Sequence, residues 1–148
     1  MRDKKIAFEP RLYPYQDHGG TAWAAALLGV PENAVIKTLV MEAEDGHAFI
    51  VLMHGDCDVS TKQLARELGH KRISPAGEAT AQKHTGYQIG GISPFGTRSK
   101  MQVFAEASIF NLPKIYINGG KRGFLVEMNP ADLHSALGVT AVNAAIPR

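Results

Sequence analysis

A lysine inside an apolar stretch is the first residue whose position points to chemistry. The stretch reads VIKTLVM (35–41), and its β-branched residues predict a strand. Side chains alternate between the two faces of a strand, so Lys37 would share a face with Val35 and Leu39. An isolated ammonium is costly to bury, so it must reach water or bind an anion. Lys37 is therefore either an edge lysine that extends to solvent or the floor of a cleft that binds phosphate or carboxylate.

A glycine-rich loop, GYQIGGISPFGTR (86–98), is the second candidate, and it offers mostly backbone. Gly90 and Gly91 permit positive φ angles and let another molecule approach the main chain closely. Successive N–H groups in such a loop form a concavity that suits an oxyanion or a carbonyl oxygen, and Pro94 would stiffen it. The alternative is a tight turn between two elements.

Two familiar glycine motifs do not fit this loop. A Walker loop needs Lys and then Ser or Thr after its last glycine, where this chain has Thr97 and Arg98. A nucleophile elbow, G-x-S-x-G, is one residue shorter than the segment here, and Pro94 has no N–H to donate to an oxyanion. Ser93 is therefore not expected to act as a serine-hydrolase nucleophile.

The other reactive residue types indicate little catalysis by side chains. The six histidines show no H-x-H or H-E-x-x-H spacing, so no metal site and no cofactor is predicted. Cys57 lies between two aspartates, which would raise its pKa and weaken it as a nucleophile. Lys121 and Arg122, in NGGKRG, either clamp phosphates or form a charged hairpin turn. A substrate that supplies its own reactive group would suit this set, with the protein contributing position and electrostatics.

The strands expected to position these residues form two hairpins. Apolar runs at 35–41 and 47–55 flank an acidic turn, and runs at 114–120 and 122–128 flank a glycine-rich one. Residues 5–15 should be extended and irregular, because two prolines interrupt them.

Helices are expected around these strands, at 21–29, 60–69, 75–86 and 129–138. The second has a capping box from Ser60 to Gln63, and the last has Asn129 as its predicted N-cap. Trp23 is assigned to the core face of the first helix rather than to a stacking platform. Since strands and helices do not alternate strictly, a mixed α/β, α+β-like fold with helices around a mixed sheet fits better than a doubly wound fold.

The length and composition of the chain limit the class of protein to which it can belong. A chain of 148 residues with 45% apolar and 20% charged residues is typical of a single soluble domain spanning 1–148. No segment has the apolar length of a membrane span or a signal peptide, so a cytoplasmic protein is expected. Residues 70–124 carry eight Lys and Arg against two Asp and Glu, a net charge of +6. This block either binds an anionic partner or is a solvated basic face.

Three stretches together resemble a known family. The lysine in VIKTLV, the loop in TGYQIGGISPFG and the later IYINGGKRGFLVEM occur in the order and spacing of the YbaK family of aminoacyl-tRNA deacylases. These are free-standing relatives of the editing domain inserted in bacterial prolyl-tRNA synthetases. The resemblance covers nearly the whole chain and implies the YbaK/ProRS-associated fold, with a barrel-like mixed sheet. It also implies removal of a wrong amino acid from tRNA, typically cysteine from tRNA(Pro), without a metal.

The resemblance assigns roles to particular residues. Lys37 matches the family's essential lysine, which is thought to hold the phosphate of the terminal adenosine. Gly90 and Gly91 match the loop whose N–H groups hold the aminoacyl carbonyl. In cysteine-specific members the substrate thiol is proposed to attack its own ester, and in other relatives a ribose hydroxyl and a bound water do this. The implied substrate contacts are Tyr13, Ile92, Ser93, Pro94, Lys121 and Arg122.

One position departs from the family pattern and leaves alternatives open. The cysteine deacylases carry an acidic residue just after the KRG stretch, where this chain has Leu125. Alanine, serine or another small amino acid is then also open as the substrate. A non-catalytic module that binds an RNA end or a synthetase is an alternative, as is a small-molecule esterase or nucleotide binder that uses the same cleft. Aminoacyl-tRNA is the implied partner, and prolyl-tRNA synthetase could supply selectivity for the tRNA.

Overall fold

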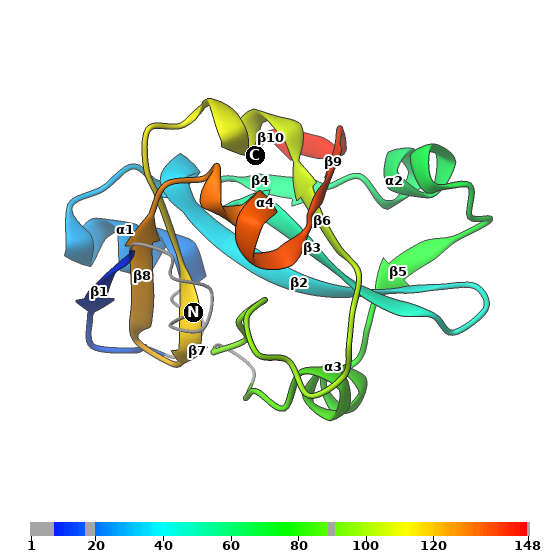
Figure 1. Ribbon diagram of the computed structural model, residues 1–148, viewed down its shortest axis with the longest axis horizontal. Helices are drawn as coiled ribbons and strands as arrows, with labels where there is room; N and C mark the ends of the chain where they lie inside the picture. The colour runs from blue at the N-terminus through cyan, green and yellow to red at the C-terminus, as the bar shows by residue number, and fades with distance from the viewer. Residues whose placement is uncertain (1–7, 17–19, 89–90, 148) are drawn as a thin grey trace.

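The computed structural model describes residues 8–16, 20–88 and 91–147, which form a mixed β-sheet with helices on both faces (Figure 1). The neighbours β7 and β2, β3 and β6, and β6 and β9 run parallel, and the other neighbours on this path are antiparallel. The predicted mixed sheet is thus confirmed. Its strands follow the order β1 (Phe8–Leu12), β8 (Phe124–Met128), β7 (Ile115–Lys121), β2 (Val35–Ala43), β3 (Ala48–His54), β6 (Val103–Glu106) and β9 (Thr140–Val142).

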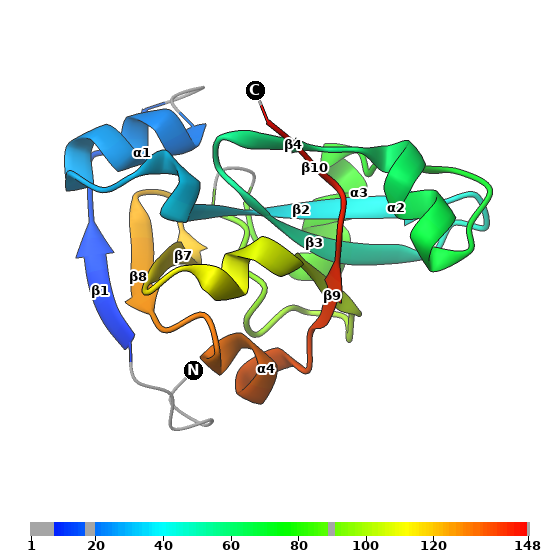
Figure 2. The ribbon, with the colours of Figure 1, turned by 90° about the horizontal axis from the view of Figure 1, so that it is seen from above.

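Different helices cover the two faces of this sheet, as Figure 2 shows from above. Helices α3 (Glu78–Thr85) and α4 (Asp132–Leu137) and the 3-10 turn η3 (Ala107–Asn111) pack on one face, over the largest apolar cluster. Helices α1 (Gly20–Leu28) and α2 (Thr61–Leu68) contribute to two smaller clusters on the other face. A second 3-10 turn, η2 (Glu32–Ala34), leads into β2, and a small sheet pairs β4 (Cys57–Val59) with β10 (Ala145–Pro147).

Strand β2 has two different neighbours along one edge. Its other edge pairs with β3 from Ile36 to Glu42. On the first edge, β7 pairs only with Val35 and Ile36, whereas β5 (Ile73–Pro75) pairs only with residues 41–43. Residues 37–40 therefore face no neighbouring strand on that edge within the described ranges. This split in the sheet lies next to the candidate lysine.

The helix signals in the sequence match the structure with one shift. Ser60 caps α2 through its Oγ, which accepts the Gln63 amide at 3.2 Å, and Gly69 ends the helix at a φ of 77°. The predicted N-cap at Asn129 is wrong, because α4 begins only at Asp132. The Asn129 side chain instead accepts the amide of Ala131 at 3.0 Å, which makes a turn before the helix. No helix in the described part of the chain is long and apolar enough to cross a membrane.

Two leucines allow the core to be tested with a matched pair of variants. Leu52, at the centre of β3, is 0% exposed, whereas Leu12, at the end of β1, is 76% exposed. We expect Leu52→Ala to lower the free energy of unfolding by about 2–5 kcal/mol, because it leaves a cavity in the largest cluster. Leu12→Ala should change it by roughly 0.5 kcal/mol or less. Urea denaturation measures both, and equal effects would contradict the assigned core.

Candidate functional site

A cleft of about 980 Å³ opens where the sheet splits beside β2. It is lined from both faces of the sheet, because residues 35–41 of β2 contribute side chains of both orientations. From the α1 side come aromatic and small residues, and from the α3 side come Gln88 and Ile92. The cleft thus combines a mostly apolar strand segment that carries Lys37 and Thr38, an aromatic wall and residues of the glycine-rich loop.

Lys37 lies in this cleft, in agreement with the cleft-floor interpretation of the sequence. Its side chain is 21% exposed, and its Nζ lies 3.7 Å from Oδ1 of Asp58 on β4. Asp58 is itself 60% exposed, so water weakens this long contact. Flanking it on the same face, Val35 packs with α1 and Leu39 with the α2 cluster. The ammonium therefore stands between two apolar clusters, where an anionic ligand can compete for it.

Thr38 is a cleft residue that the sequence analysis missed. It points away from the face that carries Lys37, toward the face covered by α3. Its Oγ1 is buried and has no hydrogen-bond partner among the described residues. Its backbone also faces the split, since the Val40 carbonyl accepts the Ala76 amide there and strand amides alternate in direction. A threonine next to Lys37 carries no separate signal in the sequence, because β-branched residues are common in strands.

Gly91 brings the glycine-rich loop against the β7–β8 turn. A Cβ atom at this position would lie 2.8 Å from the Arg122 nitrogen and 2.8 Å from the Lys121 carbonyl carbon. The glycine is therefore required by close approach of two main chains, and not by a positive φ. The Gly91 N–H donates to the Gln88 carbonyl at 2.8 Å and closes a turn. Gly90, the other predicted glycine, lies outside the described residues.

Of the three loop residues that the resemblance assigns to substrate contacts, one lines the cleft and two are buried. Ile92 lines the cleft, as the resemblance implies. Ser93 is 0% exposed and its Oγ accepts the Phe95 amide at 3.1 Å, while Pro94 is buried beside it. Neither lines the cleft, so the structure does not place these two predicted contacts at the substrate. Ser93 and Pro94 instead support the loop from the interior of the protein.

Aromatic side chains form the α1 side of the cleft. Tyr13 lines it and is tied to the hairpin turn by its amide, which donates to the Gly123 carbonyl at 2.9 Å. Burial raises the pKa of the Tyr13 hydroxyl, which keeps it neutral and able to donate. Trp23 also lines the cleft and donates to the Pro14 carbonyl at 2.7 Å, so its predicted place in the core is wrong.

The two basic residues of the NGGKRG turn differ in position. Arg122 lines the cleft, and its guanidinium carbon lies 4.9 Å from the centre of the Tyr15 ring, within range of a cation–π contact. Lys121 is exposed and does not line the cleft. The structure therefore brings only Arg122 to the site and leaves Lys121 at its rim.

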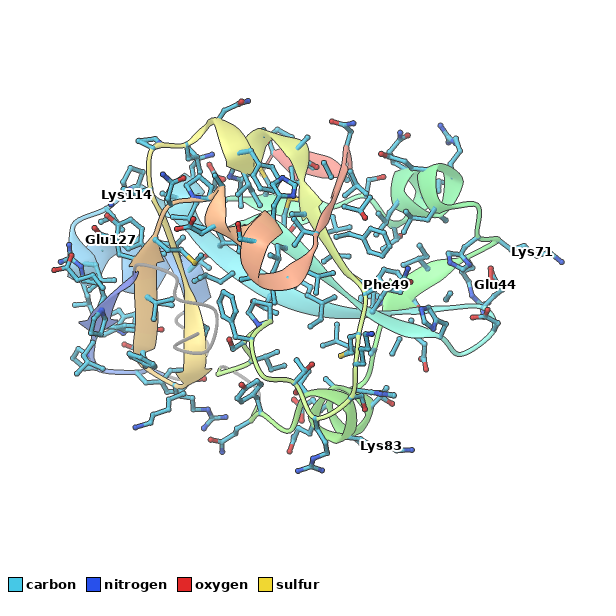
Figure 3. The ribbon with its side chains drawn as sticks, viewed as in Figure 1. Glu44, Phe49, Lys71, Lys83, Lys114 and Glu127 are labelled. Atoms are coloured by element: carbon cyan, nitrogen blue, oxygen red, sulfur yellow. The ribbon has the colours of Figure 1, made fainter. Side chains whose placement is uncertain are left out.

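An ion pair fixes the strand that leads to Tyr13. Arg11 on β1 donates to Oε1 of Glu127 on β8, with its Nε at 3.1 Å and its Nη2 at 2.6 Å. Lys114 lies 4.0 Å from Oε2 of the same carboxylate, and Figure 3 shows the two labelled side chains close together. The hydrogen bond from Arg11 holds the pKa of Glu127 below its usual value. The ion pair thus helps to hold β1 to β8 at every pH at which the Glu127 carboxylate is ionised.

Leu125, the departure from the family pattern, belongs to the apolar wall of the cleft. It is 4% exposed and packs with Ala24, Ala25 and Val35. Leu125, Ala24 and Val35 all line the cleft. This part of the wall offers contact to a small apolar group and no charge.

Cys57 and the residue types that bind metals can be placed within the described part of the chain. Cys57 is buried, and burial raises the pKa of its thiol, with Asp56 adding to the shift. The predicted direction is confirmed, although burial and not the aspartates is the largest cause. No group of three or more His, Cys, Asp or Glu residues in the described ranges is arranged to hold a metal ion.

Comparison with known proteins identifies the family. A profile of the aminoacyl-tRNA editing domain matches residues 20–136. The chain belongs to this family. The sequence resemblance to editing deacylases is thereby confirmed at the level of the family, whose activity is deacylation of aminoacyl-tRNA.

Two named relatives contain a region similar to this chain in proteins of different length. "Putative Cys-tRNA(Pro)/Cys-tRNA(Cys) deacylase EbsC" of Enterococcus faecalis is 26% identical over 78% of this chain and 70% of its own length. A proline--tRNA ligase of Geobacter sp. is 34% identical over 74% of this chain but only 18% of its own length. The chain therefore spans about a fifth of the ligase and most of the free-standing relative.

Solved structures share the fold at low sequence identity. A "putative trans-editing enzyme for prolyl tRNA synthetase" superposes with a TM-score of 0.84 at 21% identity, covering 94% of this chain and 87% of that one. A hypothetical protein reaches a TM-score of 0.89 at 23% identity, covering 98% and 95%. The predicted fold of the family is thus confirmed.

The contact between Gly91 and the β7–β8 turn can be tested with alanine. We expect Gly91→Ala to push the loop off this turn, because the new Cβ would overlap backbone atoms that cannot rotate away. The variant should lose about 1–3 kcal/mol of unfolding free energy. Gly77→Ala is the control, since its Cβ meets no atom within 4 Å and its φ of −67° suits alanine. Similar thermal and urea stability for the two variants would contradict the contact.

The buried hydroxyl of Thr38 predicts a substitution that stabilises the protein. Thr38→Val replaces an Oγ1 that has no described partner with a methyl group of similar size, so the unfolding free energy should rise by about 1 kcal/mol. Thr38→Ser keeps the hydroxyl and loses a methyl group, so it should not stabilise. A loss of stability in Thr38→Val would mean that the hydroxyl is already hydrogen-bonded.

Proposed function

We propose that this protein is a trans-editing deacylase that removes a mischarged amino acid, cysteine in the first instance, from tRNA(Pro). The observation that carries the proposal is that Lys37, Ile92 and Arg122 line one cleft although they are far apart in the sequence. Membership of the editing family supports the activity, and the name of the Enterococcus relative supports cysteine as substrate. We extend the proposal to a single editing domain over residues 1–148 that acts in the cytoplasm.

Lys37 is assigned to the phosphate of the terminal adenosine. Its Nζ stands at the split of the sheet, 3.7 Å from Oδ1 of Asp58, a carboxylate that is 60% exposed. A phosphate that enters the cleft would bring two or more charged oxygens to the lysine and form a stronger, charge-assisted hydrogen bond. Arg122 lies at the same cleft and would add a second positive charge beside the aromatic wall.

The amides of the glycine-rich loop are assigned to the ester carbonyl. Gly90 and Gly91 would donate to the oxygen as negative charge develops on it. Because the Gly91 N–H already bonds the Gln88 carbonyl, it would have to share or exchange that bond when substrate enters. Ile92 offers the next amide along the loop and a side chain in the cleft. Ser93 and Pro94 would support this geometry from below.

The thiol of a cysteinyl substrate gives one route to ester cleavage. Its sulfur loses a proton and bonds to the carbonyl carbon, the bond to the ribose oxygen breaks, and that oxygen takes up a proton. A cyclic thioester leaves and is hydrolysed by water. For other amino acids, water that is oriented by the ribose hydroxyl adds to the carbonyl carbon, the bond to the ribose oxygen breaks, that oxygen takes up a proton from the water, and the free amino acid leaves. Each route uses groups of the substrate and water, and the protein supplies position and charge.

Two further groups fit the aminoacyl part of the substrate. Thr38 Oγ1, buried in the cleft region without a described partner, could accept a hydrogen bond from the α-ammonium group. Leu125 would contact the amino-acid side chain through an apolar wall. This wall favours alanine as the second candidate substrate, since alanine offers a methyl group and no charge.

The proposed partners are aminoacyl-tRNA and prolyl-tRNA synthetase. The relationship to proline--tRNA ligases, which contain a similar region, supports the second. A deacylase that works in trans would act on tRNA that the synthetase has charged and released. The net charge of +2 is small for a protein that binds RNA alone, so the synthetase would contribute selectivity.

Deacylation of charged tRNA tests the function and the role of Lys37 together. Cys-tRNA(Pro), Ala-tRNA(Pro) and Pro-tRNA(Pro) are incubated with wild type, Lys37→Met and the exposed control Lys100→Met. We expect the wild type to clear cysteine or alanine and to spare proline. Lys37→Met should be slower by about 10–100-fold, the loss of one charge-assisted contact. Lys100→Met should match the wild type.

Four outcomes would count against parts of this proposal. Unchanged rates for Lys37→Met would remove the lysine from the site while keeping the activity. Preference for alanine would make Leu125 the basis of selectivity. Failure of the wild type to clear any substrate, even with prolyl-tRNA synthetase present, would favour a non-catalytic module that binds a tRNA end or the synthetase. Turnover of free aminoacyl esters without tRNA would instead favour a small-molecule esterase.

A further inference from the structure

A second hollow, of about 490 Å³, lies between α2 and the strand β5. Its charged rim is formed by Lys62 and Arg66 on α2 and by His70, Lys71 and Arg72 on the following loop, and we call it the α2 basic pocket. Lys62, Arg66, Lys71 and Arg72 are all exposed. Figure 3 shows Lys71 projecting outward beside α2.

The cations of the α2 basic pocket are not neutralised by ion pairs. In the described ranges, no carboxylate oxygen lies within 4 Å of the charged groups of its lysines or arginines. Arg66 only donates to the side-chain oxygen of Gln63 at 3.3 Å. Four like charges around one hollow repel each other and create a local positive potential, which an anionic ligand would relieve.

Two nearby carboxylates are engaged by backbone groups. Glu44 accepts the Lys71 amide at 2.6 Å, and this bond is the main reason why the pKa of Glu44 is lowered. Its Oε1 also lies 3.4 Å from Nδ1 of His70. Glu67 accepts the Asn143 amide at 3.1 Å. Both carboxylates hold the segments that shape the pocket, while the cationic side chains extend into solvent.

The α2 basic pocket continues the cleft that contains Lys37. Thr61, the first residue of α2, lines both hollows. The strand β5 also borders both, with Pro75 in the cleft and Ile73 in the pocket. Because the two hollows share Thr61, a chain that ends in the cleft would meet these cations if it ran on past the start of α2.

We propose that the α2 basic pocket binds the backbone phosphates of the single-stranded RNA end whose last nucleotide enters the cleft. This inference rests on the proposed function, which puts a charged nucleotide at Lys37. Each nucleotide adds one phosphate, so a short single-stranded segment would match several cations. No Phe, Tyr or Trp side chain in the described ranges lines the pocket. The ring of His70, which does line it, already stacks against Phe49, so binding should depend mainly on charge and not on sequence.

Binding of RNA without any amino acid attached tests the pocket by itself. The probe is a fluorescent RNA hairpin with a single-stranded 3′-terminal ACCA, and the comparison is the same hairpin with a blunt end. The pocket variant is Lys62→Gln/Lys71→Gln. The control is Lys83→Gln/Lys100→Gln, which removes two exposed lysines elsewhere and leaves the same net charge. Fluorescence anisotropy is measured over a series of salt concentrations.

We expect the pocket variant to bind the overhang hairpin roughly tenfold more weakly than the control. For this variant, the slope of log K against the logarithm of the salt concentration should be smaller in magnitude by about 1.4. This difference corresponds to two lost phosphate contacts with single-stranded RNA. Binding of the blunt hairpin should be the same for both variants. Equal losses for pocket and control variants would overturn the proposal, as would failure of the wild type to bind the overhang hairpin.

Kinetics separate this inference from the proposed function. With aminoacyl-tRNA, the pocket variant should raise KM and leave kcat near the wild-type value, because the phosphates only position the substrate. With an aminoacyl ester of adenosine, which carries no phosphate, the variant should equal the wild type. Pocket-dependent binding by a protein that does not deacylate would support the pocket and refute the enzyme. Deacylation with equal KM for pocket and control variants would refute the pocket alone.

Discussion

Strand β2 carries two partners on one edge, and neither covers its middle. A strand within a sheet normally satisfies its backbone groups with neighbours on both sides, and an open stretch exposes them. Here the open stretch is only four residues long, and the long pairing with β3 holds it straight. The cleft, the position of Lys37 and the backbone of Thr38 at its edge all follow from this interruption. The apolar clusters on the two faces keep the remaining strands rigid around it.

Local signals in the sequence account for much of what surrounds the split. The helix that begins after Ser60, the two hairpins and the isolated lysine depend on residues close in the chain, and the structure contains each of them. The family resemblance extended this to the fold, because the spacing of its motifs reflects the whole domain. Asn129 was misread for a local reason as well, since its side chain suits a turn and an N-cap about equally.

Long-range pairing explains what sequence reasoning missed. The strands β5 and β9 have three residues each, too few for a readable alternation, and the residues that pair with β5 lie thirty or more positions away in the chain. The split could not be foreseen without these pairings. Gly91 was singled out for its freedom in φ, whereas its actual requirement is the nearness of Lys121 and Arg122. Burial of Ser93 and exposure of Trp23 to the cleft likewise depend on packing that no local pattern encodes.

The contact at Gly91 joins two segments of the backbone, the loop and the β7–β8 turn, and it involves no side chain. Such a contact is indifferent to the identity of most neighbouring residues, so it can persist while the side chains on the facing wall change. Leu125 stands on that wall, supported by α1 and not by the loop. Under the proposed function, the fold thus separates the loop, which would hold the backbone of the ligand, from the wall, which would contact its side group. A lineage built on this scaffold can acquire a new preference by single substitutions on the wall without rebuilding the loop.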